Sequence, residues 1–347
     1  MRILVAMSGG VDSSVAAALL VADGHDVVGA TLKLWGGPSD SGCCSVADVD
    51  DARRVAQQLG IDHHVFNLTG EFEDKVVGPY VAAHAAGRTP NPCIECNRHI
   101  KFDRLLARAR RLGFDALATG HHARVALTPD GRYRLRRGAD EHKDQSYVLS
   151  MLGQEELSRV VLPVGDLTKT EVREHAARLG LRTAAKPDSQ DVCFIHGDVG
   201  RSGFLSRRLE LHPATVVDAA SGAAVGEVEA VELVTVGQRR GMGHGADGHR
   251  RYVVGVDVAA RRVVVGDPEL ATVDSVWLES LTWVDEPLRD GEPAVAQVSA
   301  HGRPVRCRFE GGGRVCFSER QRPVAPGQTV ALYDDADTVL GAGIVAR

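Results

Sequence analysis

Three cysteines stand in polar segments of the chain, where their thiols could act as nucleophiles. Cys93 and Cys96 form a CxxC pair that follows two prolines, and Cys193 lies in the charged segment 186–194. The pair precedes a basic amphipathic pattern at 98–112, and a thiol at a helix N-terminus has a pKa below its free value of roughly 8.5. Sulfur chemistry is therefore favoured, with a buried structural thiol as the alternative for Cys193.

A turn rich in glycine and serine, SGGVDSS at 8–14, separates a strand pattern at 2–7 from a helix pattern at 12–22. Glycines let the backbone approach a ligand, and serine hydroxyls together with the amides at a helix start donate to anions. No lysine follows the second glycine, so the turn differs from the triphosphate loop that ends in GK[ST]. It predicts a phosphate site, and a plain strand–turn–helix connection is the alternative. An aspartate such as Asp12 beside a triphosphate requires a cation.

The elements that must position these groups alternate between strands and helices up to about residue 200. Beyond those already named, strands are predicted at 26–34, 64–68 and 116–119, and helices at 49–59 and 168–179. Such alternation implies an α/β fold with a doubly wound, mainly parallel sheet, which binds ligands beyond the carboxyl ends of its strands. After about residue 205, short valine-rich runs broken by Gly, Pro and Asp predict small antiparallel sheets or barrels.

We therefore expect three domains. They are a catalytic domain at 1–205, a central β-rich domain at 206–272 and a C-terminal β-barrel at 273–347 that recognises a substrate.

The composition describes a soluble globular enzyme rather than a membrane or disordered protein. Hydrophobic residues make up 44% of the 347 residues and charged ones 25%, and no apolar run approaches the ~20 residues of a membrane span. Seven cysteines, an odd number without a secretion signal, argue against a disulfide framework and for a cytoplasmic location. With a net charge of -5, any affinity for nucleic acid must come from local arginine clusters, which are otherwise solvated faces. These clusters lie at 104–111, 132–137, 207–208 and 303–308.

Five motifs occur in the order and spacing of the bacterial tRNA-specific 2-thiouridylase family, a part of the PP-loop ATP pyrophosphatase superfamily, and the chain resembles that family over nearly its whole length. The motifs are SGGVDSS, the TPNPxxxCN pattern at 89–97, GHHAR at 120–124, KDQSY at 143–147 and SQDVCF at 189–194, with VGQRRG at 236–241 and PGQ at 326–328 as further matches. The resemblance implies formation of 2-thiouridine at the wobble position of tRNAs for Lys, Glu and Gln.

The resemblance also implies roles for single residues. Cys96 matches the catalytic nucleophile, Cys193 matches the cysteine that carries a persulfide, and Asp12 matches a residue that positions Mg²⁺ or the reacting groups. The positions that match ATP contacts are Ala6, Met7, Ser8, Gly9, Gly10, Val11, Asp12, Ser13, Leu32 and Gly120. The positions that match contacts to the target base or the rest of the tRNA are Asn91, Pro92, Cys93, His121, Lys143, Asp144, Gln145, Arg308, Phe309 and Gln328.

The expected mechanism uses ATP because the C2 oxygen of uridine is a poor leaving group. Transfer of AMP to that oxygen makes it expellable, and a persulfide on Cys193 then supplies sulfur to C2. Cys96 either releases sulfide from the persulfide or forms a disulfide after the transfer. The target base must be unstacked to reach the site. A cysteine desulfurase or a sulfur-relay protein is the expected sulfur donor, since nothing in the sequence resembles a pyridoxal phosphate site.

One departure from the family opens an alternative. Many members have Asp where this chain has Cys93, and Cys93, Cys96 and Cys193 together could hold a [4Fe-4S] cluster whose open iron binds sulfide. A zinc site is less favoured, because the histidines lack zinc-finger spacing. An amide-forming ATP pyrophosphatase would leave the cysteines without a role, and the intact phosphate loop argues against a nonenzymatic tRNA-binding protein.

Overall fold

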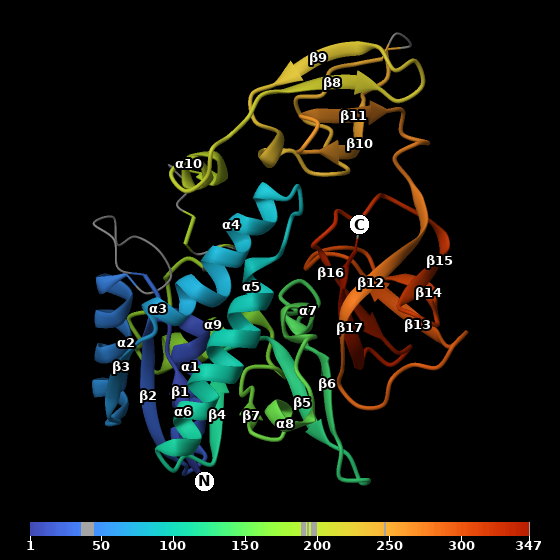
Figure 1. Ribbon diagram of the computed structural model, residues 1–347. Helices are drawn as coiled ribbons and strands as arrows, with labels where there is room; N and C mark the ends of the chain where they lie inside the picture. The colour runs from blue at the N-terminus through green and yellow to red at the C-terminus, as the bar shows by residue number, and fades with distance from the viewer. Residues whose placement is uncertain (36–44, 189–191, 193, 196–199, 246–247, 347) are drawn as a thin grey trace.

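The computed structural model describes residues 1–35, 45–188, 192, 194–195, 200–245 and 248–346. Its N-terminal part contains a five-stranded parallel sheet with the strand order β3-β2-β1-β4-β7 (Figure 1). The strands are β1 (Arg2–Ala6), β2 (Asp26–Lys33), β3 (His63–Asn67), β4 (Ala116–Thr119) and β7 (Val160–Val161). The direction of winding reverses between β1 and β4, so their carboxyl ends flank the crevice where such sheets bind ligands.

Helices cover both faces of this sheet, as expected for a doubly wound fold. Alternate residues of β1 point to opposite faces, so Ile3 and Val5 join one core cluster and Leu4 joins the other. The first cluster is closed by α1 (Val11–Ala22), α2 (Val46–Leu59) and α9 (Lys169–Arg178). The second is closed by η1 (Glu73–Val77), α4 (Gly78–Ala85), η2 (Cys96–Leu105) and α6 (Leu106–Arg111), with the short α3 (Thr69–Phe72) beside them.

The basic helix begins earlier than its sequence pattern predicts. Pro92–Glu95 forms α5, which continues directly into η2, so both thiols of the CxxC pair lie inside helical turns. The side chain of Asn91 caps this helix by accepting a hydrogen bond from the Cys93 amide at 3.0 Å. Proline is favoured in the first helical turn because its missing N–H would have no partner there. The cap and the proline together explain the earlier start.

The segment after β4 carries elements that the sequence analysis does not predict. They are a hairpin of β5 (Ala123–Leu127) and β6 (Tyr133–Arg137), followed by α7 (Ser146–Leu149) and α8 (Gln154–Leu157). In Figure 1 the hairpin stands between the parallel sheet and the C-terminal barrel, and a single bridge joins Arg136 of β6 to Thr338.

The second half of the described chain is β-rich, as predicted. After α10 (Gly200–Ser206), a four-stranded sheet in the order β10-β11-β8-β9 packs with the short η3 (Val231–Leu233). Its strands are β8 (Ala214–Asp218), β9 (Ala224–Val228), β10 (Tyr252–Asp257) and β11 (Arg262–Gly266).

A closed barrel follows, and all its neighbouring strands are antiparallel. It consists of β12 (Val273–Trp283), β13 (Pro293–Gln297), β14 (Val305–Glu310), β15 (Arg314–Gln321), β16 (Thr329–Tyr333) and β17 (Val339–Val345). The predicted fold class is therefore confirmed. Among the described residues, no helix is long and apolar enough to cross a membrane.

Candidate active site

A pocket of about 510 Å³ opens at the carboxyl ends of β1, β2 and β4. Its apolar wall consists of small and aliphatic side chains from β1, β2 and the residue after β2, namely Ala6, Ala30, Leu32 and Leu34. The phosphate loop at 8–13 and the GHH turn at 120–122 form the polar side. Ala300 and His301 reach the pocket from the barrel, so two parts of the chain enclose it.

The phosphate loop is held in a tight turn by its own serines. The hydroxyl of Ser13 accepts from the Ser8 amide at 3.1 Å, and the hydroxyls of Ser13 and Ser14 donate to the Gly10 carbonyl. Gly9 has a φ of +73°, and a Cβ there would lie 2.3 Å from the Asp48 carbonyl oxygen. Gly10 offers no side-chain cap to α1, so the first amides of this helix face the loop as donors for an anion.

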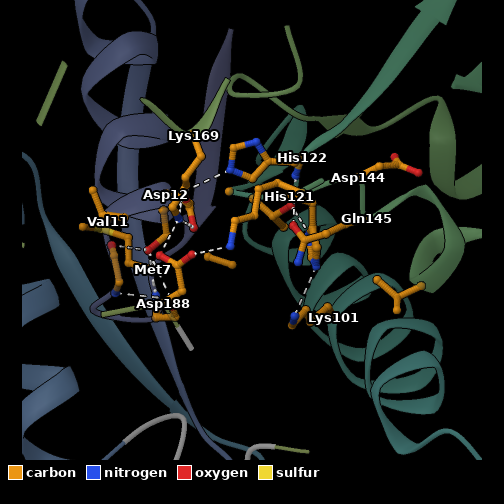
Figure 2. Close-up of a pocket in the computed structure, with 18 of the residues that line it drawn as sticks. Met7, Val11, Asp12, Lys101, His121, His122, Asp144, Gln145, Lys169 and Asp188 are labelled. Atoms are coloured by element: carbon orange, nitrogen blue, oxygen red, sulfur yellow. Dashed lines mark hydrogen bonds and ion pairs between the residues drawn. The ribbon is translucent and has the colours of Figure 1, made fainter. Parts of the chain in front are cut away.

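Asp12 is the central carboxylate of the pocket. Both of its carboxylate oxygens lie 2.7 Å from the Nζ atom of Lys169, and one accepts from Nε2 of His122 at 3.1 Å (Figure 2). Burial raises the pKa of Asp12, but the hydrogen bonds from His122 and Lys169 outweigh it and hold the pKa below its ordinary value. Asp12 is therefore ionised at neutral pH.

A second carboxylate, Asp188, forms ion pairs with three cations. It lies 2.7 Å from Lys143, 3.0 Å from Lys169 and 2.6 Å from Arg173. Burial opposes ionisation, yet hydrogen bonds from Lys143 and Lys169 lower the pKa of Asp188 to about 2. Lys169 joins Asp12 to Asp188, and all three residues line the pocket with Lys143.

Lys186 anchors the phosphate loop to the residues that pack against it. Its ammonium group donates to the Gly9 carbonyl at 2.9 Å and pairs with Asp48 and Asp51 at 2.6 and 2.8 Å. Burial lowers the pKa of this lysine, but its two carboxylate partners outweigh burial and raise it. The segment that leads to Cys193 is thereby attached to the loop.

The GHH turn closes the opposite side of the pocket. A Cβ on Gly120 would lie 2.5 Å from the Ser13 amide nitrogen, so only glycine permits this approach to the loop. His121 lies between Thr119 and Lys101, 2.6 and 3.5 Å from them, and its burial holds its pKa well below the ordinary value. Gln145 fixes the turn by bonding both the N–H and the carbonyl of His122.

The described thiols of the CxxC pair lie on the helix that borders the pocket. Cys93 and Cys96 are three positions apart, a spacing that makes two residues neighbours on a helix surface. Lys101, which lines the pocket, is five residues after Cys96 in the same helical stretch. Cys93 and Cys96 are partly exposed, and Ile94 between them is buried.

Cys193 lies outside the described residues, as do Cys43 and Cys44. The residue after it, Phe194, is buried against Phe72 and Tyr80, with ring centroids 5.6 Å apart in both pairs. Burial raises the pKa of Tyr80, and the nearby Cys93 adds to this effect. Tyr80 therefore lies near the CxxC pair and also packs against the residue that follows Cys193.

The residues predicted to contact tRNA separate into those at the pocket and those elsewhere. His121, Lys143, Asp144 and Gln145 line the pocket. Asn91 and Pro92 start the thiol-bearing helix, and the side-chain amide of Gln328 donates to the carbonyl of Thr89 just before it. The barrel thus holds the segment on which the CxxC pair is mounted.

Two of these residues make their described contacts within the protein itself. Phe309 faces the barrel core, is 6% exposed and packs on Trp283, whereas Arg308 faces outward. The carboxylate of Asp144 accepts from the Gly138 amide, from the amide and hydroxyl of Ser146, and from Arg137. Asp144 therefore fixes the chain around the pocket, and in Figure 2 it points away from the charged cluster.

The arginine cluster at 132–137 is also engaged inside the molecule. Arg132 and Arg134 both pair with Asp285, and Arg137 lies 2.9 Å from both Asp144 and Asp337 and stacks over the ring of Tyr333. These side chains join the hairpin to the barrel, and carboxylates of the protein itself balance their charges.

Several polar residues at the pocket or its loop are absent from the sequence predictions. His122, Lys169, Asp188 and Lys101 line the pocket, and Lys186 bonds the phosphate loop. His122 lies in the GHHAR motif, and Lys186 and Asp188 precede Cys193. Their closeness in sequence to these motifs could therefore have indicated that they belong to the site. Lys169 carried no signal beyond the capping box of α9, in which Thr168 bonds Glu171.

Three family models match the chain in succession. They are a tRNA methyl transferase HUP domain at 1–197, a tRNA methyl transferase PRC-barrel domain at 202–267 and an aminomethyltransferase beta-barrel domain at 273–345. Curated relatives match over the whole chain. The tRNA-specific 2-thiouridylase MnmA of Thermobifida fusca (strain YX) is 45% identical over 100% of this chain and 96% of its own length. The protein of the same name from Mycolicibacterium vanbaalenii is 46% identical over 100% of this chain and 99% of its own.

Solved structures show a more distant similarity. The U34-tRNA thiolase NcsA from Methanococcus maripaludis, described with its [4Fe-4S] cluster, is 18% identical with a TM-score of 0.35. The match covers 52% of this chain and 57% of that chain.

Proposed function

We propose, from the premise that this chain belongs to the tRNA-specific 2-thiouridylase family, that it replaces the 2-oxygen of the wobble uridine of tRNA with sulfur at the expense of ATP. Although the family models mention methyl transfer, the relatives that match the full length are named 2-thiouridylases. The tRNAs for Lys, Glu and Gln are the expected acceptors. A methyl transfer would give no role to a phosphate loop or to the CxxC pair.

The main support for this proposal is that one helical stretch carries the CxxC thiols and also contributes to the pocket that contains the phosphate loop. The thiol-bearing turn at Cys93 and Cys96 continues into the stretch whose Lys101 lines the same pocket as the phosphate loop. The apolar wall with Leu32 suits an adenine ring, because nucleotide pockets combine apolar walls with a few fixed polar groups. Ser8 and the first amides of α1 suit the phosphates.

Activation of the uridine uses the polar side of the pocket. The C2 oxygen attacks the α-phosphorus of ATP, a P–O bond to pyrophosphate breaks, and the base carries AMP on its oxygen. Lys143 and Lys169 would stabilise the negative charge of the departing pyrophosphate. Asp12, which is ionised, would hold Mg²⁺ with the phosphates, and the ion would supply charge neutralisation.

Sulfur delivery uses the thiols. The terminal sulfur of a persulfide on Cys193 attacks C2, the C2–O bond breaks, and AMP leaves. The Cys96 thiolate then attacks the Cys193 sulfur, which releases the thiolated base and leaves a Cys96–Cys193 disulfide. In the other order, Cys96 attacks first and free sulfide reaches C2. Both routes require an external thiol to reduce the disulfide and a cysteine desulfurase or relay protein to renew the persulfide.

A second candidate route delivers sulfide from a [4Fe-4S] cluster. Cys93, which stands where many family members have Asp, and Cys96 would supply two ligands from one helical turn. Cys193 would be the third ligand. The described residues contain no group of three His, Cys, Asp or Glu that could hold a metal ion. An absorption spectrum of anaerobically purified protein distinguishes the routes, since a cluster absorbs in the visible range and a persulfide does not.

The test of the function is mass spectrometry of tRNA nucleosides after incubation with ATP, Mg²⁺ and a sulfide or persulfide source. We expect 2-thiouridine with the wild type, and none with Cys96→Ser or Cys193→Ser. The matched control is Cys316→Ser, because Cys316 is a partly exposed thiol on the barrel. Absence of 2-thiouridine with fully folded wild-type protein and all three additions would refute the proposal. Normal thiolation by either active-site variant would remove that thiol from the mechanism.

A further inference from the structure

Asp188 forms several ion pairs with the cations at the pocket although its side chain is partly exposed. Its side chain is 33% exposed, yet it pairs with Lys143, Lys169 and Arg173 within 3.0 Å. Lys143 and Lys169 also line the pocket beside the phosphate loop. A phosphate group presents the same chemistry to these cations, because carboxylate and phosphate both accept charge-assisted hydrogen bonds from lysine and arginine.

The charges of the cluster do not accommodate both Asp188 and a triphosphate. Three cations, Lys143, Lys169 and Arg173, face two carboxylates, Asp12 and Asp188. A triphosphate beside the loop would add several negative charges within a few ångströms of Asp188, and like charges at that distance repel. Asp12 is part of the loop helix α1 and bonds His122 as well as Lys169, whereas the described ion pairs of Asp188 all go to these three cations. Asp188 is therefore the carboxylate that can leave.

We infer that Asp188 occupies the place of a nucleotide phosphate on Lys143 and Lys169, and that the phosphates of ATP displace its carboxylate. This inference rests on the proposed function, because it requires nucleotide at the phosphate loop. Asp188 then balances the charge of both lysines before ATP arrives and competes with the phosphates for them.

The backbone around Asp188 is anchored independently of its carboxylate. The guanidinium of Arg173 donates to the carbonyls of Ala184 and Lys186 at 2.8 and 3.1 Å. The ammonium of Lys186 stays attached to Gly9, Asp48 and Asp51. Displacement of the carboxylate therefore leaves the anchored backbone at Ala184 and Lys186 in place.

The test compares the Kd values of three probes for wild type and Asp188→Asn, in the presence of Mg²⁺ and without tRNA. The probes are ATP, pyrophosphate and adenosine. Asparagine keeps the shape of the side chain and removes the competing charge, so we expect ATP and pyrophosphate to bind about tenfold more tightly. Adenosine, which has no phosphate, should bind equally to both proteins. Asp166→Asn is the matched control, because it removes the same charge from a side chain that is 82% exposed.

An unchanged or weaker affinity of Asp188→Asn for ATP would overturn the inference, and so would an equal gain for adenosine, which would indicate a general opening of the pocket. A melting temperature within a few degrees of the wild type confirms that the variant is folded. Wild-type protein that binds no ATP would refute the proposed function itself. Wild-type protein that binds ATP and thiolates tRNA, with no gain in Asp188→Asn, would refute this inference alone.

Discussion

The Nζ atom of Lys169 lies 2.7 Å from both carboxylate oxygens of Asp12, although 157 residues separate them in the chain. Lys169 is the first residue of α9 and Asp12 lies in the first turn of α1. The two helices pack side by side on one face of the sheet, so their N-terminal ends meet at the pocket. A cation from a distant helix thus balances the carboxylate that follows the phosphate loop.

We predict that Lys169→Met lowers ATP-dependent pyrophosphate release by roughly 100-fold. The variant removes a cation aimed at developing phosphate charge, and loss of one such group costs on the order of 10²–10³ in rate. The measurement is single-turnover pyrophosphate release in the presence of tRNA. Lys169→Arg should recover part of the loss. Arg178→Met, which removes an exposed cation from the last turn of the same helix, should stay within threefold of the wild type. A Lys169→Met rate equally close to the wild type would contradict this role.

We predict that Gly120→Ala destabilises the protein and weakens ATP binding together. The new Cβ would lie 2.5 Å from the Ser13 nitrogen and 2.6 Å from the Asp12 carbonyl carbon, and backbone atoms cannot move aside as a flexible side chain does. Overpacking of this kind costs about 1–3 kcal/mol, and here the loop must shift. Urea unfolding and ATP titration measure the two effects. Gly70→Ala is the control, because a Cβ at Gly70 meets no atom within 4 Å; equal behaviour of the two variants would disprove the close approach.

We predict that substitutions at two neighbouring residues of β14 impair different properties, namely stability at Phe309 and tRNA binding at Arg308. Phe309 is 6% exposed in the barrel core, and Phe→Ala in a core costs about 3–5 kcal/mol. Phe309→Ala should therefore lower the free energy of unfolding by that amount. Arg308 faces outward and its guanidinium donates to the Gly291 carbonyl. Arg308→Ala should change stability little and weaken tRNA binding in a salt-dependent manner. Unfolding in urea and filter binding at two salt concentrations separate the outcomes, and loss of tRNA affinity without loss of stability in Phe309→Ala would contradict this prediction and support a tRNA contact by Phe309 itself.

The strand alternation of β14 places Arg308 and Phe309 on opposite faces. Val305, Cys307 and Phe309 point inward and Arg306 and Arg308 point outward, which is the period of two expected of a half-buried strand. The predicted tRNA contact therefore needs a separate test at each of the two residues. The hairpin after β4 had a similar signal, because the TPDG sequence at 128–131 is a typical turn between two strands.

The charged network of the pocket could not be predicted from the sequence. The phosphate loop and Gly120 follow strands, and Leu32 lies near the end of β2. Because parallel strands end at a common edge, the meeting of these residues could be predicted. Asp12 meets His122 and Lys169 across 110 and 157 residues. Those contacts depend on how α9 and the GHH turn pack, which no local pattern specifies.

A buried histidine joins α4 to η3, which packs with the four-stranded sheet. His84 of α4 is 2% exposed, and its Nδ1 donates to the Glu232 carbonyl in η3 at 3.1 Å. Burial, supported by the charge of Arg201, lowers the pKa of His84 to about 4 although the Glu232 carbonyl opposes this. The folded protein therefore keeps His84 neutral at pH values where the unfolded chain, in which a histidine has a pKa of roughly 6.5, binds a proton at this residue. The stabilisation by neutral His84 is complete above pH 6.5, declines as the pH falls and is lost near pH 4.

We predict that acidification from pH 7 to pH 4.5 lowers the free energy of unfolding of the wild type by roughly 2–3 kcal/mol more than that of His84→Gln. Glutamine can still donate to the Glu232 carbonyl but does not titrate. Urea unfolding at several pH values gives the difference between the two proteins and cancels the titration of all other groups. His64→Gln, which removes an exposed histidine from β3, should follow the wild-type curve. Parallel curves for the wild type and His84→Gln would show that His84 titrates alike in the folded and unfolded states, and so that burial does not keep it neutral.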